Sequence, residues 1–272
     1  MNASGPFETA GDPEELDRAV AAAAPVMLER ADFAMVNALQ PSMHASVFGL
    51  LLSLADNKYM LGRRYAEWCT GAPMLESAVA AAAMAQDELG HARSFYPLLR
   101  GFPRGLDMRP MEEKGWQQRP TAAMTCLDRP FGTWCDFLAA NLVVDTALTT
   151  LLSAATESPY EPLRQRARKI QQEESAHWVH AAGWLRRVQP ADADMGAALA
   201  RVWDDALTWF GQADDPILTP LVEAGLLGDG PDGLRDTLRA RLEPLLSAAG
   251  AERVLAHDLP WDRWDPAARR LK

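Results

Sequence analysis

The sequence MAQDELGHARSFYPL, residues 84–98, is the most informative stretch of the chain, because it places a glutamate and a histidine one helical turn apart in an alanine-rich segment. Residues three or four apart share one face of an α-helix, so Glu88 and His91 point to the same side. That face also carries a stripe of small and apolar side chains, which are Ala81, Met84 and Phe95. The pattern predicts a helix that directs Glu88 and His91 into the protein core.

A second segment, IQQEESAHWVHAAGW at residues 170–184, repeats the Glu-x-x-His motif with Glu174 and His177. Asp145 supplies a further carboxylate, because it is the charged member of an otherwise apolar stripe on a predicted helix near 133–156. Two Glu-x-x-His motifs on separate helices, with a carboxylate from a neighbouring helix, are the ligand pattern of di-metal carboxylate bundles. Imidazole and carboxylate together suit iron or manganese, so the sequence predicts a metal site of that kind.

Each Glu-His pair has a simpler interpretation, a solvated surface pair of residues i and i+3. The apolar residues beside both motifs argue against it, because a surface pair lies among polar neighbours. A lone carboxylate such as Asp145 in a bundle core is costly unless it is paired or binds a metal. Of the remaining histidines, His44 and His257 lack ligand spacing, and we interpret them as structural. His180 lies one turn past His177, so it is either a residue that supports a ligand from outside or, as the simpler interpretation, a buried histidine with satisfied hydrogen bonds.

The composition of the 272-residue chain excludes several classes of partner. The formal net charge of -10 argues against nucleic acid or an anionic membrane surface. The chain contains no apolar run of the length that predicts a membrane span, and its acidic N-terminus lacks the basic region of a secretory signal. Three cysteines without a Cys-x-x-Cys pair fit a reducing compartment. We therefore expect a cytoplasmic protein without membrane or nucleic-acid partners.

Helix signals dominate the chain, and alternating strand patterns are nearly absent. A connection at 101–132, with four prolines and four glycines, is typical of a lid, a docking surface or a crossover. Long helices joined by one long crossover form the ferritin-like arrangement. We predict an all-α fold, a ferritin-like four-helix bundle with additional N- and C-terminal helices, as a single domain over 1–272 with its core at about 42–188 and C-terminal helices and tail at about 191–272. The helices are expected near 13–30, 42–68, 74–99, 133–156, 160–188 and 191–210, with shorter ones within 215–256.

Four motifs carry a resemblance to a known family, and they are AEWCTGAPMLE (66–76), QDELGHAR (86–93), EESAHW (173–178) and WDDALTWFG (203–211). Over about residues 45–211 the chain resembles the ferritin-like oxygenase subunits of phenylacetyl-CoA epoxidase and benzoyl-CoA epoxidase. The resemblance implies a di-iron oxygenase that receives electrons from a reductase and activates O2 to epoxidise an aromatic ring held as a CoA thioester. It further implies that five of the six metal ligands are present, namely Glu88, His91, Asp145, Glu174 and His177.

The sixth ligand position holds Lys58, where the family has a glutamate 30 residues before the glutamate of the first motif. Helical periodicity places Lys58 on the inward stripe of its helix, while Asp56 and Glu67 fall on other faces. One alternative is that Lys58 extends out of the bundle to solvent. Because Lys58 brings a different functional group to a ligand position, we take it as the candidate catalytic residue. Its side chain is either an ammonium group near the vacated ligand position or a neutral amine that binds metal or attacks a carbonyl.

Charge predicts one metal ion at this site rather than two. Glu88, Asp145 and Glu174 carry three negative charges, which one divalent ion and a protonated Lys58 neutralise. Two divalent ions would leave an excess of positive charge. An uncompensated charge in a bundle core destabilises the fold by roughly several kcal/mol. We therefore expect a single ion, iron or manganese, on Asp145, Glu174 and His177.

Two functions of different classes are consistent with these features. The first is a metal-dependent oxidase or oxygenase with an altered site, acting on an aromatic or acyl substrate such as a CoA thioester. The second is a non-catalytic scaffold subunit that binds a catalytic homologue, because the family also contains a subunit that has lost its ligands. Iron binding without redox turnover is a third interpretation. We expect a homo- or hetero-oligomer, with a homologous subunit and a reductase as partners. We also expect an extended C-terminal tail at 260–272, which is a candidate for docking on a partner.

Overall fold

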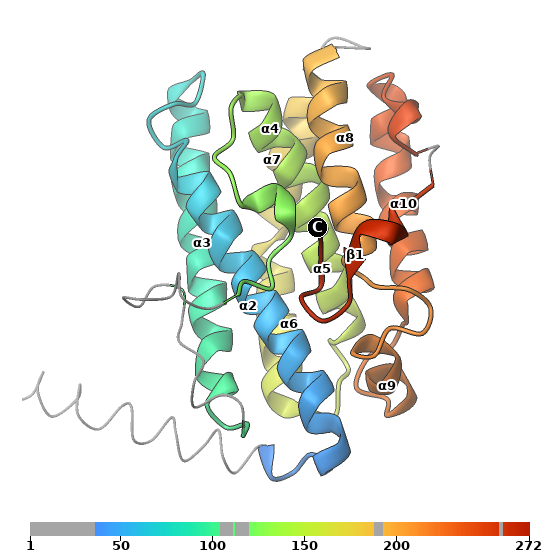
Figure 1. Cartoon of the computed structure of the whole chain (residues 1–272). Coiled ribbons are helices and arrows are strands. Elements are labelled where there is room, and N and C mark those ends of the chain that lie inside the picture. The colour runs from blue at the N-terminus through green and yellow to red at the C-terminus, as the bar shows by residue number, and fades with distance from the viewer. Residues whose placement is uncertain (1–35, 104–110, 112–119, 188–192, 256–257) are drawn as a thin grey trace, which may run out of the picture.

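The computed structural model describes residues 36–103, 111, 120–187, 193–255 and 258–272, and it shows an all-α fold (Figure 1). The long helices run roughly along one axis, and one short antiparallel hairpin is the β-structure of the described residues. The helices are α2 (His44–Ala66), α3 (Leu75–Leu99), α4 (Trp134–Ala139), α5 (Asp145–Ala154), α6 (Glu161–Glu173), α7 (Ser175–Leu185), α8 (Ala193–Thr208), α9 (Leu218–Glu223) and α10 (Pro231–Ala248). The strands are β1 (Trp264–Asp265) and β2 (Arg270–Leu271), and short 3-10 turns occupy Pro41–Met43, Thr125–Leu127, Glu252–Leu255 and Trp261–Arg263.

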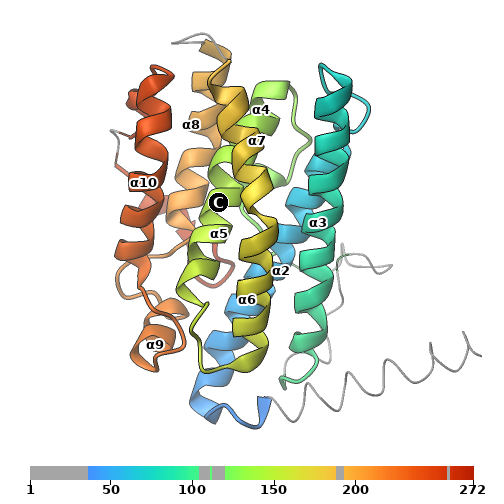
Figure 2. The ribbon, with the colours of Figure 1, turned by 180° about the vertical axis from the view of Figure 1, so that it is seen from behind.

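The bundle core consists of α2, α3 and two rods, α4–α5 and α6–α7 (Figures 1 and 2). Helix α2 packs along α3, and α5 packs against α6. The connection predicted at 101–132 joins these two pairs of elements, so its interpretation as a crossover is the one that the topology supports. The predicted ferritin-like bundle is confirmed, and α8, α9 and α10 are its additional C-terminal helices. The helix predicted near 13–30 lies outside the described residues.

Both rods depart from the uninterrupted helices that their sequences predict. A π-helical turn, Ala140–Val144, separates α4 from α5. The helix predicted near 160–188 is divided into α6 and α7 at Glu174, although the helical backbone hydrogen bonds continue through this residue. A local side-chain bond provides a physical reason for the irregularity, because the Ser175 hydroxyl donates to the carbonyl oxygen of Gln172 (3.1 Å). Such bonds compete with the backbone ladder and bend helices.

The rod α4–α5 lies in the middle of the molecule, between α8 and α10 on one side and the other bundle helices on the other (Figures 1 and 2). The helical stretch Trp134–Ala154 is long and apolar enough to cross a membrane, and 89% of its apolar window is buried inside the protein. A helix that is covered on every side needs no polar face. The central position of the rod therefore explains its apolar composition.

The described end of the connection, residues 120–127, is fixed to α2. The backbone amide of Ala122 donates to Asp56 Oδ2 (2.9 Å), and the amide of Met124 donates to Asn57 Oδ1 (2.9 Å). Both acceptor side chains are fully buried. Buried polar groups of this kind are normally paired, so the two side chains hold the returning chain in the core. This end of the connection is consequently not a loose cover over the bundle.

The C-terminal tail folds back onto its own chain as a short hairpin, so the expectation of an extended segment is wrong. Strands β1 and β2 form a hairpin whose turn contains Arg269, which has a φ of 53°. The buried Arg269 guanidinium donates to both carboxylate oxygens of Asp215 (2.7 and 2.9 Å) and to the carbonyl oxygen of Trp209 (2.6 Å). The Thr125 hydroxyl donates to the carbonyl oxygen of Leu271 (2.6 Å). The tail thus packs against α8 and the end of the connection.

We expect the substitution Arg269→Ala to lower the free energy of unfolding by about 3–5 kcal/mol, because it leaves Asp215 as an unpaired buried charge. The exposed Arg263, which donates to the carbonyl oxygen of Lys272, provides the control. Arg263→Ala should change the free energy of unfolding by about 0.5 kcal/mol or less. Equilibrium unfolding in urea measures both values. Similar small effects in the two variants would contradict the role assigned to Arg269.

Candidate functional site

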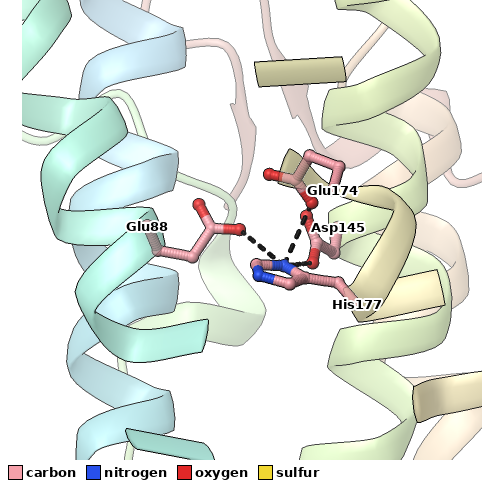
Figure 3. A group of neighbouring side chains, drawn as sticks. All are labelled: Glu88, Asp145, Glu174 and His177. Atoms are coloured by element: carbon pink, nitrogen blue, oxygen red, sulfur yellow. Dashed lines mark hydrogen bonds and ion pairs between the residues drawn. The ribbon is translucent and has the colours of Figure 1, made fainter. Parts of the chain in front are cut away.

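Four side chains of metal-ligand type converge in the interior of the bundle. Glu88 projects from α3 toward Asp145, Glu174 and His177, which belong to the two rods opposite (Figure 3). One ligand atom of each residue lies within 4.8 Å of those of the other three, and all four side chains are buried. The result is an acidic and histidine cluster of a composition that can hold a metal ion.

Local backbone features place these side chains. Gly62 of α2 lies beside Glu88, and a Cβ atom on it would be 3.0 Å from Glu88 Cβ, so the glycine permits the close approach of α2 and α3. Asp145 begins α5 directly after the π-helical turn, a feature that is frequent at functional sites. Glu174 lies at the junction of α6 and α7, and His177 follows one turn later. Both irregularities of the rods therefore coincide with site residues.

The ammonium group of Lys58 lies among the three carboxylates. Its Nζ atom is 2.9 Å from Glu88 Oε1 and 3.2 Å from Asp145 Oδ1, and it also contacts Glu174 Oε1. The side chain is fully buried, so the alternative in which it extends to solvent is wrong. Burial alone would lower the pKa of Lys58, but attraction to Glu174, Glu88 and Asp145 holds that pKa well above its ordinary value. This geometry favours the ammonium form over the neutral amine.

Both motif histidines also face the carboxylates. His177 Nδ1 lies 2.8 Å from Asp145 Oδ2 and 3.1 Å from Glu174 Oε2, whereas His91 Nδ1 lies 3.4 Å from Glu174 Oε1. Burial alone would lower both pKa values, but the neighbouring carboxylates raise the pKa of His91 to about 9 and that of His177 well above its ordinary value. In the metal-free cluster both rings therefore favour the protonated form. The structure thus brings all five predicted ligand residues together, with His91 at the edge of the cluster.

Two acidic residues that the ligand pattern did not single out complete the contacts of the histidines. His177 Nε2 lies 3.3 Å from Asp87 Oδ2, and His91 Nε2 lies 2.9 Å from Glu173 Oε2. Each of these acids immediately precedes the glutamate of one motif, and it contacts the histidine of the other motif. The sequence signal is the doubled acid in DELGH and EESAH. Carboxylates that orient a histidine ring from outside are common around sites of this kind.

A polar chain on the opposite side of the cluster includes Asn141, which has no ligand spacing and was not recognisable from the sequence. Its amide donates to Asp145 Oδ2 (3.5 Å), and the Tyr65 hydroxyl donates to the same oxygen (3.4 Å). His180 Nδ1 lies 3.0 Å from Asn141 Oδ1 and donates to it. Burial and the nearby charge of His177 lower the pKa of His180 to about 4, so this ring is neutral. His180 thus reaches Asp145 through Asn141, while its Nε2 atom has no hydrogen-bond partner within the described chain.

Neither of the other carboxylates on the first bundle helix replaces the missing glutamate. Asp56 accepts a hydrogen bond from the Tyr96 hydroxyl (3.0 Å) and another from the Ala122 amide, on the side of α2 that faces away from the cluster. Glu67 pairs with Arg64 at 3.0 Å and is partly exposed. Both placements agree with helical periodicity. Lys58 is consequently the residue that α2 contributes to the cluster.

The positive charge of Lys58 already compensates part of the negative charge of Glu88, Asp145 and Glu174. The carboxylates also raise the pKa of His91 and of His177 in the metal-free cluster, and a bound metal ion would displace those protons. The residues present do not fit two divalent ions, because the ammonium group already contacts an oxygen of each carboxylate. A single ion would compete with Lys58 for those same oxygens. The charge argument that favours one ion counts both histidines as neutral, which is their form when they bind a metal, whereas the metal-free cluster favours their protonated form.

Comparison with known proteins agrees with the motifs and the fold. The family model described as phenylacetic acid catabolic protein matches residues 33–262. The chain is 27% identical over 195 residues to one of the subunits of the 1,2-phenylacetyl-CoA epoxidase of Escherichia coli (strain K12), a match that covers 70% of this chain and 77% of that protein. The region matched by the family model includes the bundle and every residue of the cluster. The chain therefore belongs to the phenylacetic acid catabolic protein family.

Proposed function

We propose that the protein is a metal-free scaffold subunit of a multicomponent oxygenase, in which a lysine takes the place of metal ions. The observation that carries this proposal is the position of Lys58 Nζ, which contacts one oxygen of each of three buried carboxylates. Bound cations are often the largest local charges in sites of this kind. The ammonium group supplies that charge, but it cannot change oxidation state, so the cluster has a structural role in this proposal.

The cluster connects every element of the bundle core. Lys58 comes from α2, Glu88 from α3 and Asp145 from α5, while Glu174 lies between α6 and α7. A buried ionic network with several partners penalises any other packing, because each alternative leaves a charge unpaired. We infer that the network fixes the register of the four elements, which gives a rigid surface for assembly with another protein of the complex.

The matched relative supports a role within an assembly. Its name identifies it as one subunit of an epoxidase that acts on phenylacetyl-CoA. We infer that this chain assembles in the cytoplasm with a homologous catalytic subunit, that the substrate of the assembly is an aromatic CoA thioester, and that a reductase supplies the electrons.

A second candidate function is the metal-dependent oxidase or oxygenase that the ligand motifs predict. Two buried atoms of the cluster, Glu88 Oε2 and His91 Nδ1, have no hydrogen-bond partner within the described chain, and they lie 3.8 Å apart. An iron or manganese ion held by these two residues would satisfy both atoms. Such an ion requires His91 to lose its proton, and it would lie close to the ammonium group of Lys58, which would have to withdraw or lose its proton as well. This repulsion is the reason that we place the scaffold function first.

Metal analysis of the purified protein separates the two functions. After anaerobic incubation with Fe(II) or Mn(II) and removal of free metal, we expect the wild-type protein to retain far less than about one ion per chain. Retention of about one ion or more would contradict the scaffold proposal and support the second candidate. Co-expression with a homologous subunit from the same organism provides an independent measurement. We expect the two chains to elute together and the epoxidase activity to require the catalytic one.

A further inference from the structure

A small cavity beside the cluster faces the outer helix α10. Three residues of the cluster line its inner wall, and they are Asp145, Glu174 and His177. Its outer wall includes Trp178 and Arg241, and Arg241 belongs to α10, which packs against α5 (Figure 2). The volume of the cavity is about 10 Å³, which is room for one water molecule. Because Arg241 is exposed, this outer wall separates the cluster from solvent.

An aromatic ring, rather than an acid, holds Arg241 in this wall. The guanidinium group lies over the ring of Trp178, 4.3 Å from its centre, whereas the other arginine–aromatic pairs of the described residues are 5.2 Å apart or more. Within the part of the chain that the structure describes, no hydrogen bond or ion pair joins this guanidinium to another group. An aromatic face attracts a cation without fixing the direction of its donors. Arg241 can therefore leave the ring without breaking a hydrogen bond.

Arg241 places a positive charge just outside the cluster. Partial burial lowers the pKa of Arg241 below its ordinary value, although attraction to Asp145 and Glu174 opposes this effect. The side chain is charged at neutral pH even so, because the ordinary value of an arginine lies far above 7. Lys58 already contacts an oxygen of each of the three carboxylates, so the cluster does not need Arg241 as an ion-pair partner. The charge of Arg241 acts instead on what approaches the cluster from this side.

We propose that Arg241 is a charged gate between solvent and the cluster, which keeps cations out and admits small neutral or anionic solutes when it leaves Trp178. A charge at a narrow opening with low-dielectric walls acts strongly on ions that pass it, because the protein screens it less than water does. A divalent cation on this route meets the guanidinium before it reaches Asp145 or Glu174. The gate rests on the proposed function, since it adds a second reason that the cluster stays free of metal.

The reactivity of a cysteine inside the cavity tests the gate. Thr149 lines the cavity and is buried, so Thr149→Cys places a thiol behind Arg241. Two methanethiosulfonate reagents of similar size, one with an ammonium group and one with a sulfonate group, label this thiol, and peptide mass spectrometry separates it from Cys69, Cys126 and Cys135. The quantity measured is the ratio of the two labelling rates, cation over anion. We expect Arg241→Glu to raise this ratio by about tenfold or more, because the gate then attracts cations and repels anions.

Two further variants, made together with Thr149→Cys, separate the gate from a general effect of charge. Arg241→Lys keeps the positive charge and should leave the ratio near that of the arginine form. Arg239→Glu is the matched control, because Arg239 lies on the same helix, pairs with Asp236 at 3.9 Å and does not line the cavity. This control should leave the ratio unchanged. Circular dichroism checks that all variants retain their helices, and Thr146→Cys, which lines the same cavity, repeats the measurement where Thr149→Cys does not fold.

Three outcomes would overturn the gate. The first is a ratio that Arg241→Glu leaves unchanged, and the second is an equal rise in Arg239→Glu, because either result removes the special role of Arg241. The third is a thiol that neither reagent reaches in any Arg241 variant, because the opening is then not a route to the cluster. No metal ion takes part in these measurements. The metal content of the protein reports on the scaffold function separately, so the failure of one proposal is distinguishable from the failure of the other.

Discussion

We expect the variant Lys58→Glu to bind about two Fe(II) ions per chain, whereas the wild-type protein retains almost none. The substitution removes the ammonium group from Glu88, Asp145 and Glu174, and it adds a fourth carboxylate from α2. Four carboxylates balance the charge of two divalent ions, and His91 and His177 are then free to act as neutral ligands. Because metal binding releases protons from such ligands, the affinity should rise with pH up to about 9, the pKa of His91. Metal analysis after anaerobic loading and desalting measures the stoichiometry.

The same substitution at an exposed lysine provides the control for this result. Lys169 lies on α6 with 71% of its side chain exposed, and Lys169→Glu changes the net charge of the protein by the same amount. This control should bind no more iron than the wild-type protein, because its new carboxylate lies outside the cluster. If Lys58→Glu folds normally and still binds no iron, Lys58 is not the residue that excludes the metal, and the proposed function loses its main support.

We expect the variant Lys58→Met to lose about 3–5 kcal/mol of folding free energy. Methionine is close in size to the lysine stem, so the packing of the stem is largely kept, but three buried carboxylates lose their shared cation. Leaving such charges without their partner costs more than the ion pairs themselves contribute. Equilibrium unfolding in urea, followed by far-ultraviolet circular dichroism, measures the loss.

A divalent ion should partly reverse this loss in Lys58→Met but not in the wild-type protein. An ion that binds the folded state alone raises the free energy of unfolding in proportion to the logarithm of its concentration above the dissociation constant. We therefore expect Mn(II) to raise the unfolding midpoint of the variant, and Lys169→Met to change stability by about 0.5 kcal/mol or less. A loss below about 1 kcal/mol in Lys58→Met would show that the carboxylates find other partners.

Helical periodicity in the sequence was enough to predict which side chains point into the bundle. The spacing of apolar residues placed Glu88, His91, Glu174 and His177 on inward faces, and the structure finds each of them buried in the bundle. Periodicity also separated Lys58 from Asp56, which share a helix but face different neighbours. These inferences are reliable because a residue's direction on a helix depends only on its position in the repeat. The long Pro- and Gly-rich connection likewise indicated the crossover of the ferritin-like fold.

The tertiary structure decided how the inward side chains are paired and which of them are charged. The sequence showed that Lys58 points inward, but its contacts come from α3, α5 and the α6–α7 junction, which are distant in the chain. Protonation of His91 and His177 depends on the distances to several carboxylates at once, which no local pattern specifies. The return of the C-terminal tail onto Asp215 also depends on long-range contacts. Local periodicity sets direction, whereas distance and charge in a buried cluster result from the packing of all the helices together.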